Sequence, residues 1–289
     1  MSDEPKNISL VTVNAESIGD TAKEIYSDFI KPTAQSTGQL LSLAPRGIRA
    51  LLSPFEKWII NKEEALSETS ELVSKKLSSI PPEKIVSPEP YIAVPSLQAL
   101  SYSIDNPDLR ELFANLLATS MNTDTKEEAH PAFVEIIKQL SPLEAKIIKE
   151  SNLLLGQTIP CCHVRFQKLP EYSEDKDSIF QEIGEGYTEI DHLVIFDNFI
   201  FPDKPLNYLS PAISNLIRLG LCEVPSGITL TSPTAYDGYK NYPNIDLLRE
   251  EMKRSLSNNN QSIEYNIYFI KESIRATSLG IKFYDFCVK

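Results

Sequence analysis

The chain has 289 residues, with 40 acidic and 28 basic side chains and a formal net charge of −12 at pH 7. This length can hold two domains, or one large domain, around a substantial buried core. The acidic balance argues against a nucleic-acid-binding protein, because affinity for a phosphate backbone depends on Lys and Arg side chains.

The sequence shows no secretion or membrane-spanning signal. Residues 1–6 lack the basic start and apolar run of a signal peptide. No stretch reaches the about 18–20 apolar residues that a membrane-spanning helix needs. Four cysteines are few for a secreted disulfide scaffold. We therefore expect a cytoplasmic protein, with peripheral contact to the inner membrane as an open alternative.

Residues 1–12 are polar and predict a flexible tail. A helical domain is expected to follow over residues 13–140. Its first helix covers about residues 13–33, because Ile18, Ile25 and Phe29 recur on one face at helical spacing.

Segment 29–62 combines basic charge with a dense apolar pattern. It holds five basic residues and one acidic residue inside an acidic protein, together with the single tryptophan. This composition is typical of an amphipathic helix on an anionic membrane surface, and it is also the composition of a helical hairpin buried in its own domain. The candidate membrane- or partner-binding residues are Arg46, Arg49, Leu51, Phe55, Lys57 and Trp58.

The next helix is predicted from Pro54 to about Ser79, with acidic residues first and basic residues last, as the helix dipole favours. Ile80-Pro81-Pro82 ends this helix. Pro88, Pro90 and Pro95 then predict a stiff connection to the following helices.

Well-marked helices follow between residues 105 and 155. Asp105-Asn106-Pro107 predicts a capped helix start, with Leu109 to Leu117 as the apolar face and Arg110, Glu111 and Asn115 on the other face. His130 is expected to begin the next helix. Ser141-Pro142-Leu143-Glu144 has the form of a capping box.

This part of the chain also carries a family resemblance. The run YIAVPSLQALSYSIDNPDLRELFANLLATSMN, followed by HPAFVEIIKQLSPLEAKII, resembles the abortive infection alpha (Abi-alpha) family of bacterial proteins. The resembling block covers about residues 81–155, and a looser likeness extends from about residue 15 to the C-terminus. The resemblance implies a helical fold and a role in defence against bacteriophage. It carries over no catalytic residues.

Residues 141–289 predict an α+β domain with a β insertion at about residues 157–203. Strands are expected at 161–166 and 192–201, on either side of an acidic loop, and again at 221–224 and 263–275. The order of helices and strands resembles a winged helix with insertions. The predicted fold class is therefore mainly α, with an all-helical N-terminal half followed by an α+β, winged-helix-like C-terminal half.

No catalytic arrangement stands out, so we expect a protein that is not an enzyme and that needs no cofactor. Gly184-Glu185-Gly186 lacks the third glycine of a nucleotide loop. Cys161 and His163 would share one side of a strand and are weak metal candidates. Structural zinc sites usually show paired ligands twice over, so no metal site is predicted, and Cys161 and Cys162 are expected to be small, buried apolar residues.

Three functional hypotheses follow. The first is a non-enzymatic antiphage protein that acts on the inner membrane through segment 29–62. The second is an interaction scaffold or adaptor, and the third is a winged-helix transcription regulator. We expect a protein partner, either a phage component or a second copy of the chain, with the membrane surface as a further partner. Nucleic acid is disfavoured, because the candidate reading helix 211–219 offers one basic residue, Arg218.

Overall fold

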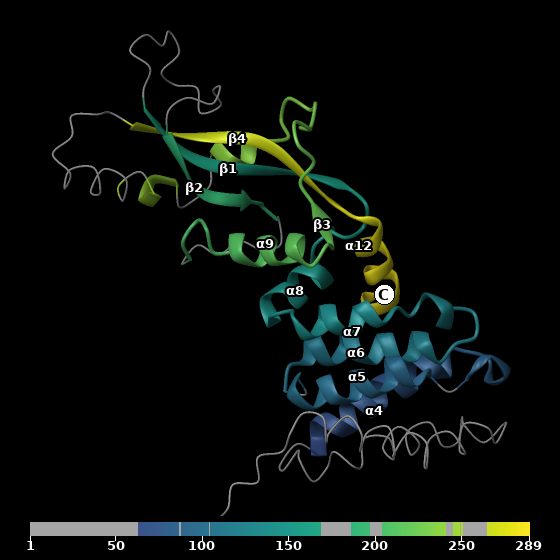
Figure 1. The fold of residues 1–289 in the computed structure, drawn as a ribbon. Helices are drawn as coiled ribbons and strands as arrows, with labels where there is room; N and C mark the ends of the chain where they lie inside the picture. Colours follow the sequence, from purple (N-terminus) through teal and green to yellow (C-terminus); the bar gives the residue numbers. More distant parts are fainter. Residues whose placement is uncertain are drawn as a thin grey trace, which may run out of the picture. The chain divides into compact units, whose positions relative to one another are not determined.

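The computed structural model describes residues 63–86, 88–103, 105–168, 186–196, 204–240, 245–248, 250 and 265–289. The chain divides into two compact units, residues 1–138 and 139–289 (Figure 1). The expected tail, the first helix and the basic segment 29–62 lie outside the described residues. So do the candidates of that segment, which are Arg46, Arg49, Leu51, Phe55, Lys57 and Trp58.

The described part of the first unit consists of helices joined by short turns. The elements are α4 (Glu63–Ser78), η2 (Pro82–Lys84), α5 (Pro90–Ser103), α6 (Pro107–Ser120), η3 (Lys126–Glu128) and α7 (Pro131–Lys138). Helix α6 packs against α4, α5 and α7. An antiparallel bridge between Ile85 and Asn122 joins the segments that precede α5 and follow α6.

Helix α6 begins as its sequence predicts, but it is buried on more sides than expected. The Asn106 side chain accepts a hydrogen bond from the Leu109 amide at 3.0 Å, and Pro107 occupies the first turn. The expected apolar face is buried, but so are Arg110 and Asn115, which are only 7% and 5% exposed. Their placement on an outer face was wrong, because α6 has helices packed around it rather than along one side.

The prolines at the start of the family block do not form a stiff connection. Pro90 begins α5, and this helix continues through Pro95 to Ser103. A proline in the first turn loses no needed hydrogen bond, whereas Pro95 lacks the amide that an interior helical residue donates. Ile92 and Leu100 are each 1% exposed, so burial of apolar side chains compensates for the missing bond.

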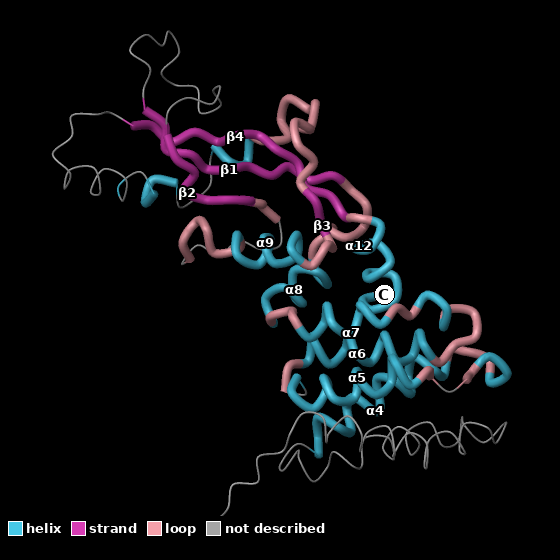
Figure 2. The backbone as a smooth tube through the Cα atoms, in the orientation of Figure 1, coloured by secondary structure: helices cyan, strands magenta, loops and turns pink. Residues whose placement is uncertain are grey.

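The second unit is built on a sheet. Its elements are α8 (Pro142–Glu150), β1 (Thr158–Lys168), β2 (Gly186–Leu193), α9 (Ser210–Arg218), β3 (Cys222–Glu223), α10 (Asp237–Lys240), β4 (Tyr265–Ala276), α12 (Ser278–Phe283) and η4 (Tyr284–Val288). The strands run antiparallel in the order β2-β1-β4-β3. Strands β1 and β4 pair without interruption from Thr158↔Arg275 to Lys168↔Tyr265. The long strands curl along their length (Figure 2).

The predicted fold class is therefore wrong. Of the described residues, about 50% are helical and 19% lie in strands, and the strands form a curled, antiparallel, four-stranded sheet. The described part of the N-terminal half is not all-helical, because Ile85 and Asn122 form a β-bridge. The long β1–β4 pair also differs from the short wing that the winged-helix hypothesis requires. Its two strands are about a hundred residues apart in the sequence, so their pairing cannot be read from any local pattern.

The strand predicted at 192–201 is also misplaced. Strand β2 covers Gly186–Leu193, and the described residues after it, 194–196, are not part of a strand. The apolar run misled the prediction, because Val194 and Phe196 are buried outside the ladder. The strands predicted at 221–224 and 263–275 are confirmed by β3 and β4.

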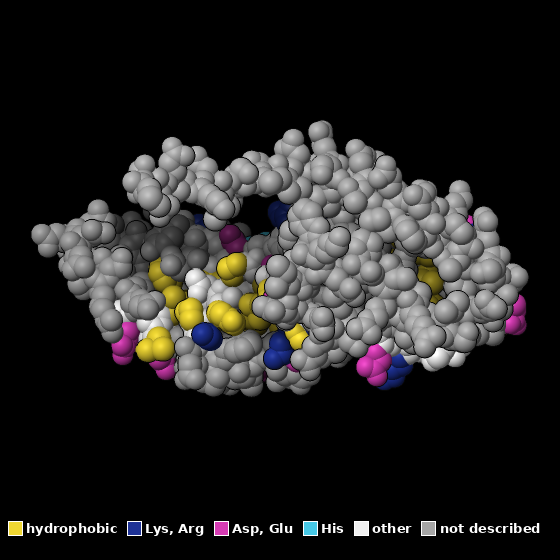
Figure 3. Space-filling model, turned by 90° about the horizontal axis from the view of Figure 1, so that it is seen from below, with side chains coloured by type: hydrophobic (Ala, Val, Ile, Leu, Met, Phe, Trp, Pro, Cys, Tyr) yellow, Lys and Arg dark blue, Asp and Glu magenta, His cyan; other side chains and the backbone are white. Residues whose placement is uncertain are grey.

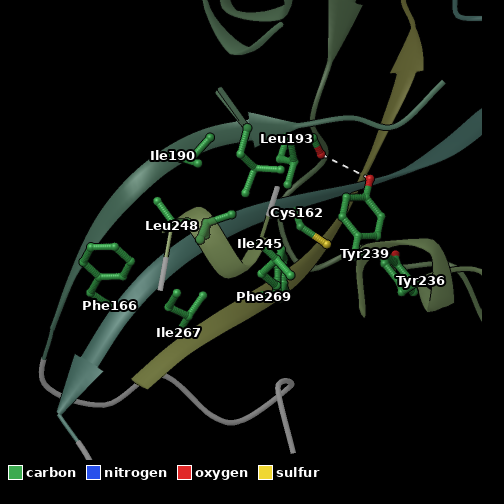
Figure 4. Packing of buried hydrophobic residues seen from close by; sticks show 12 residues of the cluster. Cys162, Phe166, Ile190, Leu193, Tyr236, Tyr239, Ile245, Leu248, Ile267 and Phe269 are labelled. Carbon is green, nitrogen blue, oxygen red and sulfur yellow. Dashed lines mark hydrogen bonds between the residues drawn. The ribbon is translucent and has the colours of Figure 1, made fainter. Parts of the chain in front are cut away.

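An apolar core covers one face of the sheet. Side chains of β1, β2 and β4 meet two tyrosines of the α10 region and the helical residues 245–248 (Figure 4). The core residues are Cys162, Val164, Phe166, Ile190, Leu193, Leu206, Tyr236, Tyr239, Ile245, Leu248, Ile267 and Phe269. Because successive residues of a strand point to opposite faces, this core assigns Cys161 and His163 to the other face.

Hydrophobic side chains of described residues also reach the surface, and some are visible in Figure 3. The large ones that are at least about one third exposed are Tyr91, Leu155, Ile228, Leu247, Leu279 and Ile281. Among the described residues, no helix is both long enough and apolar enough to cross a bilayer.

Candidate functional site

A group of polar, metal-ligating side chains lies on the sheet face opposite the apolar core. Cys161 and His163 come from β1, and Glu272 comes from β4. Cys161 pairs directly with Glu272 across the ladder, and His163 lies two residues further along β1. The prediction that Cys161 and His163 share one side of a strand is confirmed.

A β-bulge adds His192 to this group. Between the pairs Cys162↔Leu193 and Val164↔Ile190, strand β1 has the single residue His163, while β2 has Asp191 and His192. His192 is in the left-handed backbone region, with φ 52°. A bulge bends the strand that carries it and redirects a side chain. The rings of His163 and His192 lie 5.1 Å apart between centroids.

The bulge and the ladder together bring three ligand types to one point. The Sγ atom of Cys161, one ring nitrogen of His192 and one carboxylate oxygen of Glu272 all lie within 4.8 Å of one another. Cys161 is fully buried, while His192 and Glu272 are partly buried. Thiolate, imidazole and carboxylate are the side-chain ligands that zinc uses in proteins.

His163 lies between two carboxylates. Its Nε2 atom is 2.7 Å from Oε2 of Glu272, and its Nδ1 atom is 3.0 Å from Oδ1 of Asp191. The two contacts are close but are not aligned as hydrogen bonds. Within the described part of the chain, His192 Nδ1 is buried without a hydrogen-bond partner, whereas Glu272 Oε2 and His163 Nδ1 have these two contacts in place of aligned hydrogen bonds. A buried polar atom without a partner, such as His192 Nδ1, costs about 1–3 kcal/mol.

Burial sets the protonation of the cysteine and of the bulge histidine. It raises the pKa of the Cys161 thiol to about 12, and the nearby Glu272 charge contributes to the rise. Burial lowers the pKa of His192, and His163 lowers it further. At neutral pH the thiol is therefore protonated, and the neutral form of His192 is favoured. A neutral imidazole is the form that binds metals.

Two core tyrosines fix the backbone under these side chains. The Tyr239 hydroxyl lies 2.9 Å from the carbonyl oxygen of Pro160 and 3.2 Å from that of Leu193, so it bridges β1 and β2. Figure 4 shows the bond to Leu193. The Tyr236 hydroxyl donates to the Glu272 carbonyl at 2.6 Å. Pro160 and Leu193 are the chain neighbours of Cys161 and His192, so all three candidate ligands are anchored from the opposite face.

Sequence reasoning found part of this group and missed the rest. Cys161 and His163 are the weak metal candidates of the sequence, and His192 is not among them. Glu272 was missed, because no local signal marks it and only the β1–β4 pairing brings it to Cys161. The expectation that Cys161 and Cys162 are buried is confirmed, and Cys222 and Cys287 are buried as well.

Two further residues named from the sequence have local structural roles. His130 accepts a hydrogen bond from the Ala132 amide through Nδ1 at 3.1 Å, so it caps the start of α7 as expected. Arg218, the one basic residue of α9, donates to the side chains of Asn215 and Gln139. These bonds hold its guanidinium group within its own unit.

Comparison with known proteins gives one match. A protein-family model described as "Abortive infection alpha" matches residues 61–287. The match covers most of the chain and includes all four side chains of the polar group. No curated protein and no solved structure matches the chain.

Proposed function

The chain belongs to the abortive infection alpha family, and from this premise we propose that it is a bacterial defence protein that acts against bacteriophage. The observation that carries the proposal is the family match over residues 61–287, which extends across both units of the structure. The proposal concerns the role of the protein in an infected cell.

We further propose that the protein acts without an enzymatic step. The reactive form of cysteine is the thiolate, and burial raises the pKa of Cys222 to about 12 and that of Cys287 well above its usual value. Cys161 is protonated at neutral pH for the same reason. Neutral, buried thiols are poor nucleophiles, which supports a binding role rather than covalent catalysis.

The defence role is tested by infection. Cells that express the full chain and cells that carry an empty vector are challenged with a panel of phages from several structural classes. We expect fewer plaques on the expressing cells for at least one class. Equal plaque numbers for every phage, with the protein detected in the cells, would contradict the proposal.

We propose the inner membrane as the site of action, through segment 29–62. Support comes from its sequence alone: five basic residues, one acidic residue and Trp58 beside a helical apolar pattern. Such a segment gains apolar burial and attraction to anionic lipid at the same surface.

Vesicle flotation tests the membrane step. Full-length protein should float with anionic vesicles and release an entrapped dye, and Leu51→Glu/Phe55→Glu should abolish both. Leu247→Glu is a suitable control, because Leu247 is 58% exposed in the second unit and this variant adds charge without touching the segment. Equal flotation of the wild type and a folded double variant would contradict membrane action through this segment.

A protein partner remains part of the proposal, either a phage component or a second copy of the chain. The transcription-regulator alternative loses its basis, because the winged-helix expectation is overturned. The bonds that hold Arg218 on α9 also favour a structural role for this side chain. The adaptor alternative predicts a partner that copurifies from infected cells and is missing from uninfected cells.

A further inference from the structure

We propose that Cys161, His192 and Glu272 form a binding site for a divalent transition-metal ion of the zinc class. The site goes beyond the proposed defence role, since it rests on geometry within residues 139–289 and not on the family match. The three residues come from three neighbouring strands, β1, β2 and β4. A bound ion would therefore link these three strands to one another.

The ligand chemistry selects the class of ion. Sulfur and imidazole ligands favour zinc and similar transition metals, whereas magnesium and calcium prefer oxygen ligands. Three protein ligands leave the fourth position of a tetrahedral ion for a water molecule or an exchangeable ligand. The ligand atoms, now within 4.8 Å of one another, would need to close to roughly 3.5 Å around an ion that binds each at about 2.0–2.3 Å. On this proposal, rotations of the three side chains would bring the ligand atoms to that distance.

Two features of the site suit a bound cation. His192 Nδ1 is buried without a hydrogen-bond partner in the described part of the chain. Glu272 Oε2 is buried and contacts His163 Nε2 at 2.7 Å without an aligned hydrogen bond, and both atoms are potential metal ligands. The β-bulge also places His192 in a left-handed backbone conformation beside the other two ligands. A cation would satisfy the carboxylate oxygen and would deprotonate the coordinating thiol.

Neighbouring groups hold the three candidate ligands in place, as they do around the ligands of known metal sites. Ligands in such sites are usually held by hydrogen-bonding neighbours that set their orientation. His163 contacts Glu272 at 2.7 Å and is itself in contact with Asp191. Tyr236 and Tyr239 fix the backbone at all three positions from the core face.

Cobalt binding gives the most direct test. Full-length protein is freed of metal with a chelator and dialysed against Co²⁺ or Zn²⁺, and the bound metal is counted per chain. We expect one ion per chain and, with Co²⁺, the near-ultraviolet charge-transfer absorption of a sulfur–cobalt bond. Binding of more than one ion per chain without that absorption, or no binding at all, would overturn the proposal.

Adjacent cysteines provide a matched pair of variants. Cys161 and Cys162 are both fully buried, but only Cys161 faces the site, while Cys162 lies in the apolar core. Cys161→Ala should remove the sulfur–cobalt absorption and weaken binding at least about tenfold, and Cys162→Ala should leave both unchanged. Glu272→Gln should also weaken binding at least about tenfold. Equal losses in the two cysteine variants would contradict the assignment.

A measurement on the unaltered chain covers the case in which a variant fails to fold. The wild-type protein is alkylated slowly under mild denaturant, with and without Zn²⁺, and modified cysteines are located by mass spectrometry. Zinc should protect Cys161 more than Cys287, which is buried away from the ligand set. Equal protection of the two cysteines would mean that zinc only stabilises the fold, and this result would contradict direct ligation.

Discussion

At the scale of single residues, the backbone of His192 shows how the polar group is assembled. A β-branched or bulky residue avoids a positive φ, and histidine tolerates it at a cost of about 1–2 kcal/mol. Here the conformation follows from the bulge, which fits Asp191 and His192 opposite His163 alone. The bulge introduces local backbone strain, and it places a second imidazole beside Cys161.

This strain predicts a difference between two substitutions that both remove the imidazole. His192→Gly should be more stable than His192→Ala by about 1 kcal/mol, because glycine adopts φ 52° without steric cost. Urea unfolding of the ion-free proteins measures the difference. If the alanine variant is equally stable, the left-handed conformation is not the native one.

The buried thiol of Cys222, which lies outside the polar group, should make the stability of the fold depend on pH. Burial raises its pKa from 9.0 to about 12, so the folded state keeps a proton that the unfolded state loses. The stabilisation that the folded state gains from the protonated thiol is fully present below pH 9. It is lost as the pH rises from about 9 to about 12, and the unfolding free energy then falls by at most about 1.4 kcal/mol per pH unit. Unfolding free energies measured from neutral to alkaline pH should fall less steeply for Cys222→Ala than for the wild type. Parallel curves would contradict the expected thiol titration.

At the scale of secondary-structure elements, local chemistry fixes several ends that the sequence alone predicts. In the capping box of α8, the Ser141 hydroxyl accepts from the Glu144 amide at 3.3 Å, and the Glu144 carboxylate accepts from the Ser141 amide at 2.6 Å. Gly220 has φ 74° just after α9, the conformation and the position in which glycine commonly ends a helix. Such signals lie within four residues of each other, so the sequence alone reveals them.

The capping box predicts a modest and specific loss of stability. Ser141→Ala should lower the unfolding free energy by about 1 kcal/mol, because two amide groups at the start of α8 lose their bonding arrangement. Ser226→Ala, at an exposed turn, is the control and should change stability little. Chemical denaturation of both variants makes the comparison, and equal stabilities would show that the box contributes nothing.

A close contact between α12 and the segment before β3 predicts a larger effect. A Cβ atom at Gly280 would overlap the carbonyl oxygen of Leu221, which also accepts from the Thr277 amide at 3.0 Å. Gly280→Ala should therefore cost about 3 kcal/mol. Gly238→Ala is the matched control, because its new Cβ would have no neighbour closer than 4.0 Å. Similar thermal unfolding of the two variants would contradict this packing of α12.

At the scale of the whole molecule, the sequence predicts the parts better than their arrangement. The helix starts at Asn106 and Ser141 and the strands β3 and β4 agree with the prediction. The continuation of α5 through Pro95 was missed, because burial outweighs the local preference of proline. The β1–β4 pairing, and with it the contact of Cys161 with Glu272, depends on residues about a hundred positions apart. No rule based on the spacing of residues in the sequence predicts a contact between positions so far apart.

The family assignment, in contrast, came from the sequence and is confirmed. The resemblance was based on about residues 81–155, and the family model matches residues 61–287. The match thus includes the whole sheet and the polar group on the sheet face opposite the apolar core. A defence role for the intact chain is the central claim that joins these observations.

The most direct test of this claim is the number of phage released by each infected cell. Cells with and without the protein are infected so that nearly every cell receives a phage, and released phage and surviving cells are counted after one growth cycle. For a phage that is restricted in the plaque assay, we predict far fewer released phage and no recovery of the infected cells. Normal release, or survival and regrowth of the infected cells, would contradict defence by abortive infection.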